Sequence, residues 1–98
     1  MSHQIIERIR EKIRLHQYDM SAHAMEEMAE DFLDIFDIEY AILKGKITRI
    51  EKDDPRGTKY VIEGLTIDQQ IPVGVVGRFA SNGRYLIITV YAITELED

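Results

Sequence analysis

Residues 71–93, IPVGVVGRFASNGRYLIITVYAI, contain the strongest indication of the fold. Its two ends are rich in Val, Ile, Phe and Tyr, the residue types that favour β-strands. Between them lies Asn82-Gly83, and this dipeptide is the strongest short signal for a hairpin turn. We therefore predict two antiparallel strands, 71–79 and 84–93, joined by a two-residue loop.

That loop fixes a register and two faces, because successive side chains of a strand alternate between faces. The expected pairs are Ser81 with Arg84, Arg78 with Ile87, Val76 with Thr89, and Gly74 with Tyr91. The face expected to pack on helices holds Val73, Val75, Phe79, Leu86, Val90 and Ala92, with Ile88 beside Gly77. The opposite face holds Pro72, Gly74, Val76, Arg78, Ile87, Thr89, Tyr91 and Ile93. A loop one residue longer would exchange the faces.

The first half of the chain has helical periodicity. Isoleucines four residues apart predict an amphipathic helix over 3–16, which could also be a loosely attached arm or an oligomer contact. Ser21 is expected to cap a second helix that packs through Ala22, Met25, Met28, Ala29 and Phe32, with a homodimer contact as the alternative use of its methionines. Asp37 is expected to cap a third helix, which ends at Lys44 and Gly45.

Residues 47–51 and 59–65 complete the sheet as two further strands. The order predicts an α+β fold in which two to three N-terminal helices pack on one face of an antiparallel sheet of about four strands. We expect a single domain over 1–98, with an N-terminal helix (1–18) and an acidic tail (95–98).

Composition excludes several classes of protein. The chain has 98 residues and no cysteine, so disulfides, thiolate catalysis and cysteine-based metal sites are excluded. No apolar run is long enough to cross a bilayer and no signal peptide is recognisable, so we expect a cytoplasmic protein without a membrane partner.

The net charge of −6 opposes general affinity for nucleic acid, because phosphates are bound by Lys and Arg. The charge is uneven, however. Residues 45–84 carry 7 basic and 5 acidic groups, a net of +2, whereas residues 1–44 carry 5 basic and 10 acidic groups. RNA is therefore expected to bind only as a local, salt-sensitive contact in the second half of the chain.

Arg78, Thr89 and Tyr91 are expected to project from one sheet face around a space left by Gly74. A guanidinium, a hydroxyl and a phenol around a gap could hold a phosphate or a carboxylate. The alternative is an arginine whose stem covers a half-exposed sheet beside a packed tyrosine.

His23 lies one helical turn before Glu27, a spacing that favours a surface ion pair or a cap at the helix N-terminus. It could also serve as a proton-transfer group, whereas metal binding is disfavoured because no second histidine lies at helical spacing. Asp53 and Asp54 precede Pro55 and Arg56 in a turn, which leaves Arg56 available to a partner.

Several short motifs occur together in the run from Ser21 to Ile93: Ser21-Ala-His23-Ala-Met25, IEYAILKG (38–45), DPRGTKY (54–60), Gly64, PVGVVGRF (72–79) and Ile88-Thr-Val-Tyr91. In this order and spacing the run resembles the bacterial domain-of-unknown-function (DUF) family 4258, over about residues 19–94.

The resemblance implies a fold similar to RelE/ParE-like toxins and the toxin role of a type II toxin–antitoxin pair, with a YgiT-type zinc-finger antitoxin as partner. RelE-like toxins are metal-independent endoribonucleases that use the RNA 2′-hydroxyl as nucleophile. On matching positions, Arg78 would stabilise phosphate charge, His23 or Tyr91 would move a proton, and Arg56 with Lys59 and Thr89 would bind RNA. No cofactor or metal is implied.

Gly74 departs from the family pattern, because many relatives have a histidine in this strand. The sequence also leaves open a non-catalytic interaction module that binds a partner, or itself as a homodimer, through the sheet face or the edge strand 47–51. A small-ligand or metal-binding domain based on His23 and Glu27 is a third possibility.

Overall fold

The computed structural model describes residues 2–94, so the predicted acidic tail at 95–98 lies outside the described residues. Three helices and five strands follow in the order α1 (Ser2–Arg14), β1 (Tyr18–Met20), α2 (Ala22–Glu30), α3 (Ile35–Lys44), β2 (Lys46–Glu51), β3 (Lys59–Leu65), β4 (Pro72–Phe79) and β5 (Tyr85–Ala92). The predicted α+β class is confirmed, with one strand more than expected.

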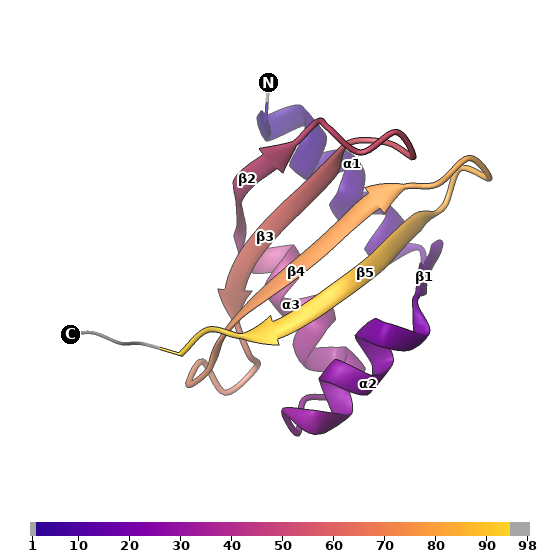
Figure 1. Ribbon diagram of the computed structural model, residues 1–98. Helices are drawn as coiled ribbons and strands as arrows, with labels where there is room; N and C mark the ends of the chain where they lie inside the picture. Colours follow the sequence, from indigo (N-terminus) through magenta and orange to yellow (C-terminus); the bar gives the residue numbers. More distant parts are fainter. Residues whose placement is uncertain (1, 95–98) are drawn as a thin grey trace.

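The strands form one sheet in the order β1-β5-β4-β3-β2, and Figure 1 looks onto the face opposite α1 and α3. All neighbours are antiparallel except β1, which pairs parallel to the start of β5. The extra strand is β1, whose three residues are too short for a periodic signal in the sequence. Arg84 holds it through hydrogen bonds to the Asp19 carboxylate and the Tyr18 carbonyl.

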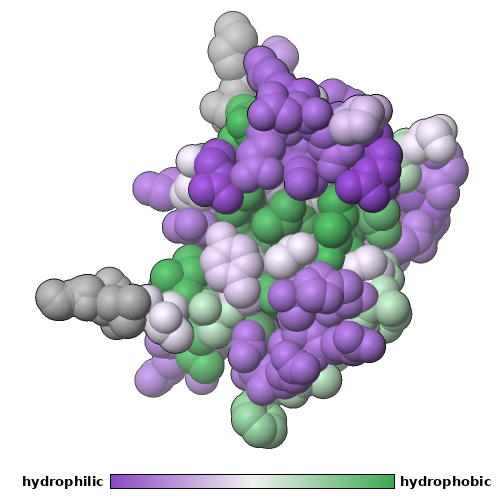
Figure 2. Space-filling model, in the orientation of Figure 1, coloured by the Kyte–Doolittle hydropathy of each residue, from purple (hydrophilic) through white to green (hydrophobic). Residues whose placement is uncertain are grey.

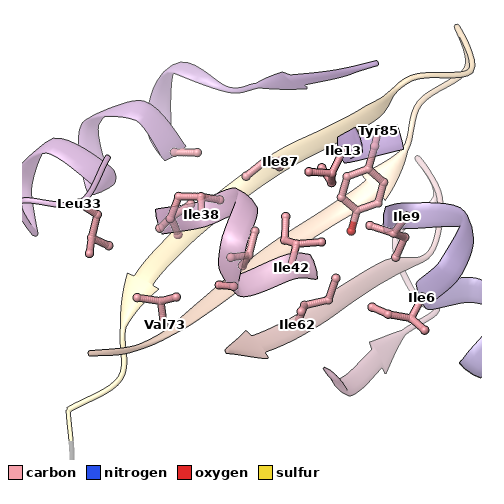
Figure 3. Packing of buried hydrophobic residues seen from close by; sticks show 14 residues of the cluster. Ile6, Ile9, Ile13, Leu33, Ile38, Ile42, Ile62, Val73, Tyr85 and Ile87 are labelled. Carbon is pink, nitrogen blue, oxygen red and sulfur yellow. The ribbon is translucent and has the colours of Figure 1, made fainter. Parts of the chain in front are cut away.

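The core lies between the sheet and the helices. The α1 side chains Ile9 and Ile13 and the α3 side chains Ile38 and Ile42 are almost wholly buried, and they pack with strand residues such as Ile62 (Figure 3). Helix α1 is therefore part of the core and not a detached arm. None of the helices in the described range is long and apolar enough to cross a membrane.

The β4–β5 hairpin corrects the predicted loop. Ala80 and Arg84 share a hydrogen bond across a three-residue loop that ends at Gly83, where φ is +87°. The extra loop residue is compensated by a bulge at Ile88, after which Val76 pairs with Thr89 as predicted. The predicted register is thus correct beyond the bulge and wrong by one residue near the turn.

The bulge exchanges the faces at the start of β5. Ile87 is buried in the core, whereas Leu86 pairs with Arg78 on the opposite face, the reverse of the prediction. The pairs Ser81–Arg84 and Arg78–Ile87 were therefore wrong. Arg78, Thr89 and Tyr91 still share one face, which we call the outer face, because the one-residue offsets of the loop and the bulge cancel.

Helix α2 also differs from its predicted packing. Ser21 caps it as expected, and its side chain accepts a hydrogen bond from the Ala24 amide. The inward face, however, holds Ala24 and Met28, whereas Met25 is 49 % exposed and Phe32 is 95 % exposed. Most of the predicted apolar stripe therefore faces solvent, because the helix packs along the edge of β5.

The capping residue of α3 was predicted three positions too late. Asp34 is the N-cap, and Asp37 completes a capping box by accepting the Asp34 amide. The expected end of this helix is confirmed at Lys44, with Gly45 directly after it.

Phe32 combines full exposure with a left-handed backbone, at φ of +57°. Its amide and that of Leu33 donate to carbonyls of the last turn of α2, the pattern in which glycine usually follows a helix. We expect Phe32→Gly to raise the free energy of unfolding by about 0.5–1 kcal/mol, because it removes a strained backbone and no buried side chain. Urea denaturation measures this gain.

Phe32→Ala is the matched control, since it removes the ring but leaves a Cβ on the left-handed backbone. It should leave the stability within a few tenths of a kcal/mol of the parent. If Phe32→Gly were no more stable than Phe32→Ala, the backbone at residue 32 would not be strained.

Candidate functional site

Three of the predicted site residues gather at the end of the outer face nearest the β2–β3 loop. Tyr60 pairs with Gly77, so Lys59 and Arg78 are the next residues along two neighbouring strands. The Arg78 guanidinium lies over the loop, with its Nη1 3.5 Å from the carbonyl oxygen of Arg56. We call Arg56, Lys59 and Arg78 the cationic cluster.

Asp54 organises this cluster. Its side chain is only 9 % exposed and pairs with the Arg56 guanidinium through both carboxylate oxygens, at 3.1 Å each, and with Lys59 at 3.7 Å. The hydrogen bonds from the Arg56 side chain and amide hold the pKa of Asp54 down at about 2, so it is anionic in any physiological solution. Arg56, predicted to be available to a partner, is instead held by Asp54, although its side chain is 73 % exposed.

Arg78 is the member of the cluster with spare hydrogen-bonding capacity. Its Nε is buried and has no hydrogen-bond partner in the described part of the chain. A buried donor without a partner is costly, and most such donors in proteins are satisfied. The three cations of the cluster face the carboxylates of Asp54 and Glu51, and Glu51 lies closer to Arg49 (2.8 Å) than to Lys59 (3.7 Å), so positive charge is in excess here.

Thr89 and Tyr91 occupy the same face farther along the sheet. Tyr91 pairs with Gly74, four residues from Arg78 on β4, which corresponds to about 13 Å along a strand. The space predicted above Gly74 is filled, because a Cβ placed there would overlap the Tyr91 ring. Gly74 therefore makes room for the tyrosine ring.

His23 is separated from these residues by its place on α2, at the outer edge of β5. Its Nε2 is 3.2 Å from a Glu27 carboxylate oxygen, which confirms the predicted ion-pair spacing. Among the described residues no group of three or more His, Cys, Asp or Glu side chains could hold a metal ion. The structure therefore joins Arg78 with Arg56 and Lys59, and places Tyr91 and His23 elsewhere.

The middle of the outer face is apolar. Val61 pairs with Val76, which pairs with Thr89, and Val61 is only 2 % exposed although it lies opposite the helices. Figure 2 shows apolar surface across the middle of this face and hydrophilic surface around it, including the end that carries the β2–β3 loop. The outer face thus combines an apolar centre with a cationic end.

The sequence interpretation missed how α2 closes the β5 edge of the sheet. Ser21 Oγ donates to the Ile88 carbonyl, Glu27 accepts the Val90 amide at 2.9 Å, and Asp31 accepts the Ala92 amide. These side chains replace a neighbouring strand beyond the end of β1. Glu27 and Asp31 are spaced one helical turn apart, a pattern that the sequence contains but that indicates only a polar helix face.

Comparison with known proteins gives one match. A family model described as a domain of unknown function, DUF4258, matches residues 20–92. No curated protein and no solved structure matches the chain. The matched range contains all six predicted site residues, whereas α1, which contributes Ile9 and Ile13 to the core, precedes it.

Proposed function

Because this chain belongs to the DUF4258 family, we propose that it is the toxin component of a type II toxin–antitoxin pair and that it cleaves RNA. The observation that carries the proposal is the cationic cluster on the sheet face opposite the helices, where the buried Nε of Arg78 has no hydrogen-bond partner among residues 2–94. The resemblance to RelE/ParE-like toxins supports the same function.

Arg78 is the centre of the proposed reaction. The RNA 2′-oxygen attacks the adjacent phosphorus and its proton passes to solvent water, and the bond to the 5′-oxygen breaks as that oxygen takes up a proton from water. The products are a 2′,3′-cyclic phosphate and a 5′-hydroxyl. Negative charge grows on the phosphate oxygens during this step, and a guanidinium stabilises that charge with directed hydrogen bonds.

The other predicted residues contribute according to their distance from Arg78. Lys59 and Arg56 adjoin it and add positive charge along the RNA backbone. Tyr91 and Thr89 lie farther along the same face, where an aromatic ring suits stacking on a neighbouring base of a single strand. His23, at the far edge of β5, would act on the reaction only if the RNA crosses the whole face.

A zinc-finger antitoxin is the proposed partner. The chain contains no cysteine, so any zinc in such a pair belongs to the antitoxin. With a net charge of −6, the toxin would hold RNA mainly through the local cluster, and its binding should weaken steeply as salt is raised.

Induced expression of the protein in bacteria tests the proposal. We expect growth to stop and messenger RNA to be cut into fragments ending in a 2′,3′-cyclic phosphate and a 5′-hydroxyl. Arg78→Ala should relieve the arrest and lower the cleavage rate of the purified protein by about 100-fold or more, as for loss of a charge-stabilising donor. Arg78→Lys should recover only part of the rate.

Arg14→Ala is the matched control, because Arg14 is a half-exposed arginine on α1, behind the sheet. It should leave arrest and cleavage unchanged. Normal growth with intact messenger RNA during induction, at a verified level of folded protein, would overturn the proposal.

A non-catalytic interaction module remains the second candidate, and the apolar centre of the outer face (Figure 2), where Val76 and Leu86 are partly exposed, favours it. On this reading the outer face binds a partner protein and Arg78 borders the contact. Partner binding that persists in an Arg78→Ala/Tyr91→Ala double variant, together with an absence of RNA cleavage by the parent protein, would select it.

A further inference from the structure

The two edges of the sheet differ in how much of their backbone is hydrogen-bonded. The β5 edge is covered by β1 and by the side chains of α2 that bind its backbone. At the other edge, no side chain in the described range forms a hydrogen bond with the backbone of β2, and β2 has only β3 as a neighbouring strand. An uncovered edge presents unpaired amides and carbonyls that another strand can bind.

The residue order of β2, KITRIE, is complementary to itself in the antiparallel direction. A two-fold axis between Thr48 and Arg49 would place Lys46 opposite Glu51 of a second copy, and Ile47 opposite Ile50. Each protomer then contributes both members of each pair, so the salt bridge and the apolar contact each form twice. Opposite charges and apolar pairs directly across a ladder stabilise a sheet.

The bulge in β2 is what makes this register possible. In a regular strand, residues five positions apart point to opposite faces and could not be cross-strand neighbours. Here the pairing with β3 shifts between Ile47 and Arg49, so that Lys46 pairs with Glu63 while Glu51 pairs with Lys59. Lys46 and Glu51 therefore both lie on the outer face.

The two isoleucines of β2 also share one face, as the proposed pairing requires. Ile47 pairs with Ile62 and Ile50 pairs with Tyr60, two residues of the core side. Ile50 is nevertheless 40 % exposed, which is unusual for an isoleucine on the core face of a sheet. A second β2 would cover it.

We propose that β2 is a homodimerisation edge, at which two copies of this chain pair antiparallel and form one continuous ten-stranded sheet. The expected partner strand is β2 of a second copy, because antiparallel pairing then places Lys46 opposite Glu51 and Ile47 opposite Ile50. The proposal does not depend on RNA cleavage, and its test has a separate readout.

Sedimentation velocity over a concentration series tests it with two charge variants. Lys46→Glu places Glu opposite Glu51 of the second copy, and Glu51→Lys places Lys opposite Lys46. Each variant alone should dimerise about tenfold more weakly than the parent or worse, since two like-charge pairs replace two salt bridges. An equimolar mixture of the two variants should dimerise again, because both pairs are then of opposite charge.

Lys12→Glu on α1 and Glu26→Lys on α2 are the charge-matched controls, and both should dimerise like the parent. Circular dichroism of every variant verifies folding. A parent that stays monomeric at several hundred micromolar would overturn the proposal. It would equally be overturned if the mixture were no more dimeric than its components.

Discussion

Replacing Gly64 with alanine is expected to lower the free energy of unfolding by about 3 kcal/mol, at the upper end of overpacking effects. Helix α3 crosses β3 at this glycine, and a Cβ there would lie 2.9 Å from Ala41 Cα and closer still to the Ala41 carbonyl oxygen. These are backbone atoms of a fully buried residue, so no side-chain rotation relieves the overlap. Urea denaturation followed by circular dichroism measures the loss.

Gly83→Ala is the matched control for this prediction. Gly83 has a φ of +87° in the hairpin loop, but nothing lies within 4 Å of the position that a Cβ would occupy. The change should cost about 1 kcal/mol from backbone strain alone. Equal losses for the two variants would mean that α3 can withdraw from β3 without penalty, in contradiction to the packing described.

Replacing Tyr85 with phenylalanine is expected to raise the free energy of unfolding by about 1–2 kcal/mol, although it removes a polar group from a wholly buried residue. The Tyr85 ring is 0 % exposed among Ile9, Ile13 and Ile42 (Figure 3). Its hydroxyl has no hydrogen-bond partner in the described part of the chain, so folding strips it of water without compensation.

The gain should grow in alkaline solution. Burial raises the pKa of Tyr85, so the folded state keeps the proton where the unfolded chain, with a pKa near 10, loses it. Ionisation of Tyr85 therefore leaves the free energy of unfolding unchanged below about pH 10 and lowers it as the pH rises above that value. In denaturation curves measured between about pH 8 and pH 11, the free energy of unfolding of Tyr85→Phe should fall less with rising pH than that of the parent.

Tyr18→Phe is a control variant for which the free energy of unfolding should decrease at neutral pH. The Tyr18 hydroxyl donates to a Glu39 carboxylate oxygen at 2.6 Å, so its removal should destabilise the protein by about 1 kcal/mol. A Tyr85→Phe variant that is also destabilised would indicate that the Tyr85 hydroxyl is satisfied in solution, for example by a buried water.

Local sequence signals predicted the parts of the fold that depend on neighbouring residues. Ser21 caps α2 because its hydroxyl reaches an amide three residues ahead, and Gly45 follows the end of α3. The contact of His23 with Glu27 follows from helical spacing alone. The predicted resemblance to DUF4258 rests on motif order and is confirmed by the family match.

The candidate site could be predicted only in part. Arg78, Thr89 and Tyr91 share a face as expected, but the sequence did not reveal that Tyr91 fills the space over Gly74. Nor did it reveal that Asp54 holds Arg56 and Lys59 beside Arg78. These contacts join residues from the β2–β3 loop to neighbouring strands, and single-sequence patterns carry no distance information across such gaps.

The order of the three helices and of strands β2 to β5, the hairpin within residues 71–93 and the uneven charge could be derived from the sequence alone, because periodicity and turn chemistry act over a few residues. The buried faces of α2 and of the start of β5, in contrast, depend on tertiary contacts. A bulge at Ile88 offset the longer hairpin loop, and the edge of β5 turned Glu27 and Asp31 toward the sheet while Phe32 faced solvent. One inserted residue turns every later side chain of a strand to the other face of the sheet. Backbone amides and carbonyls at an open edge need hydrogen-bond partners, which residues distant in the sequence can provide.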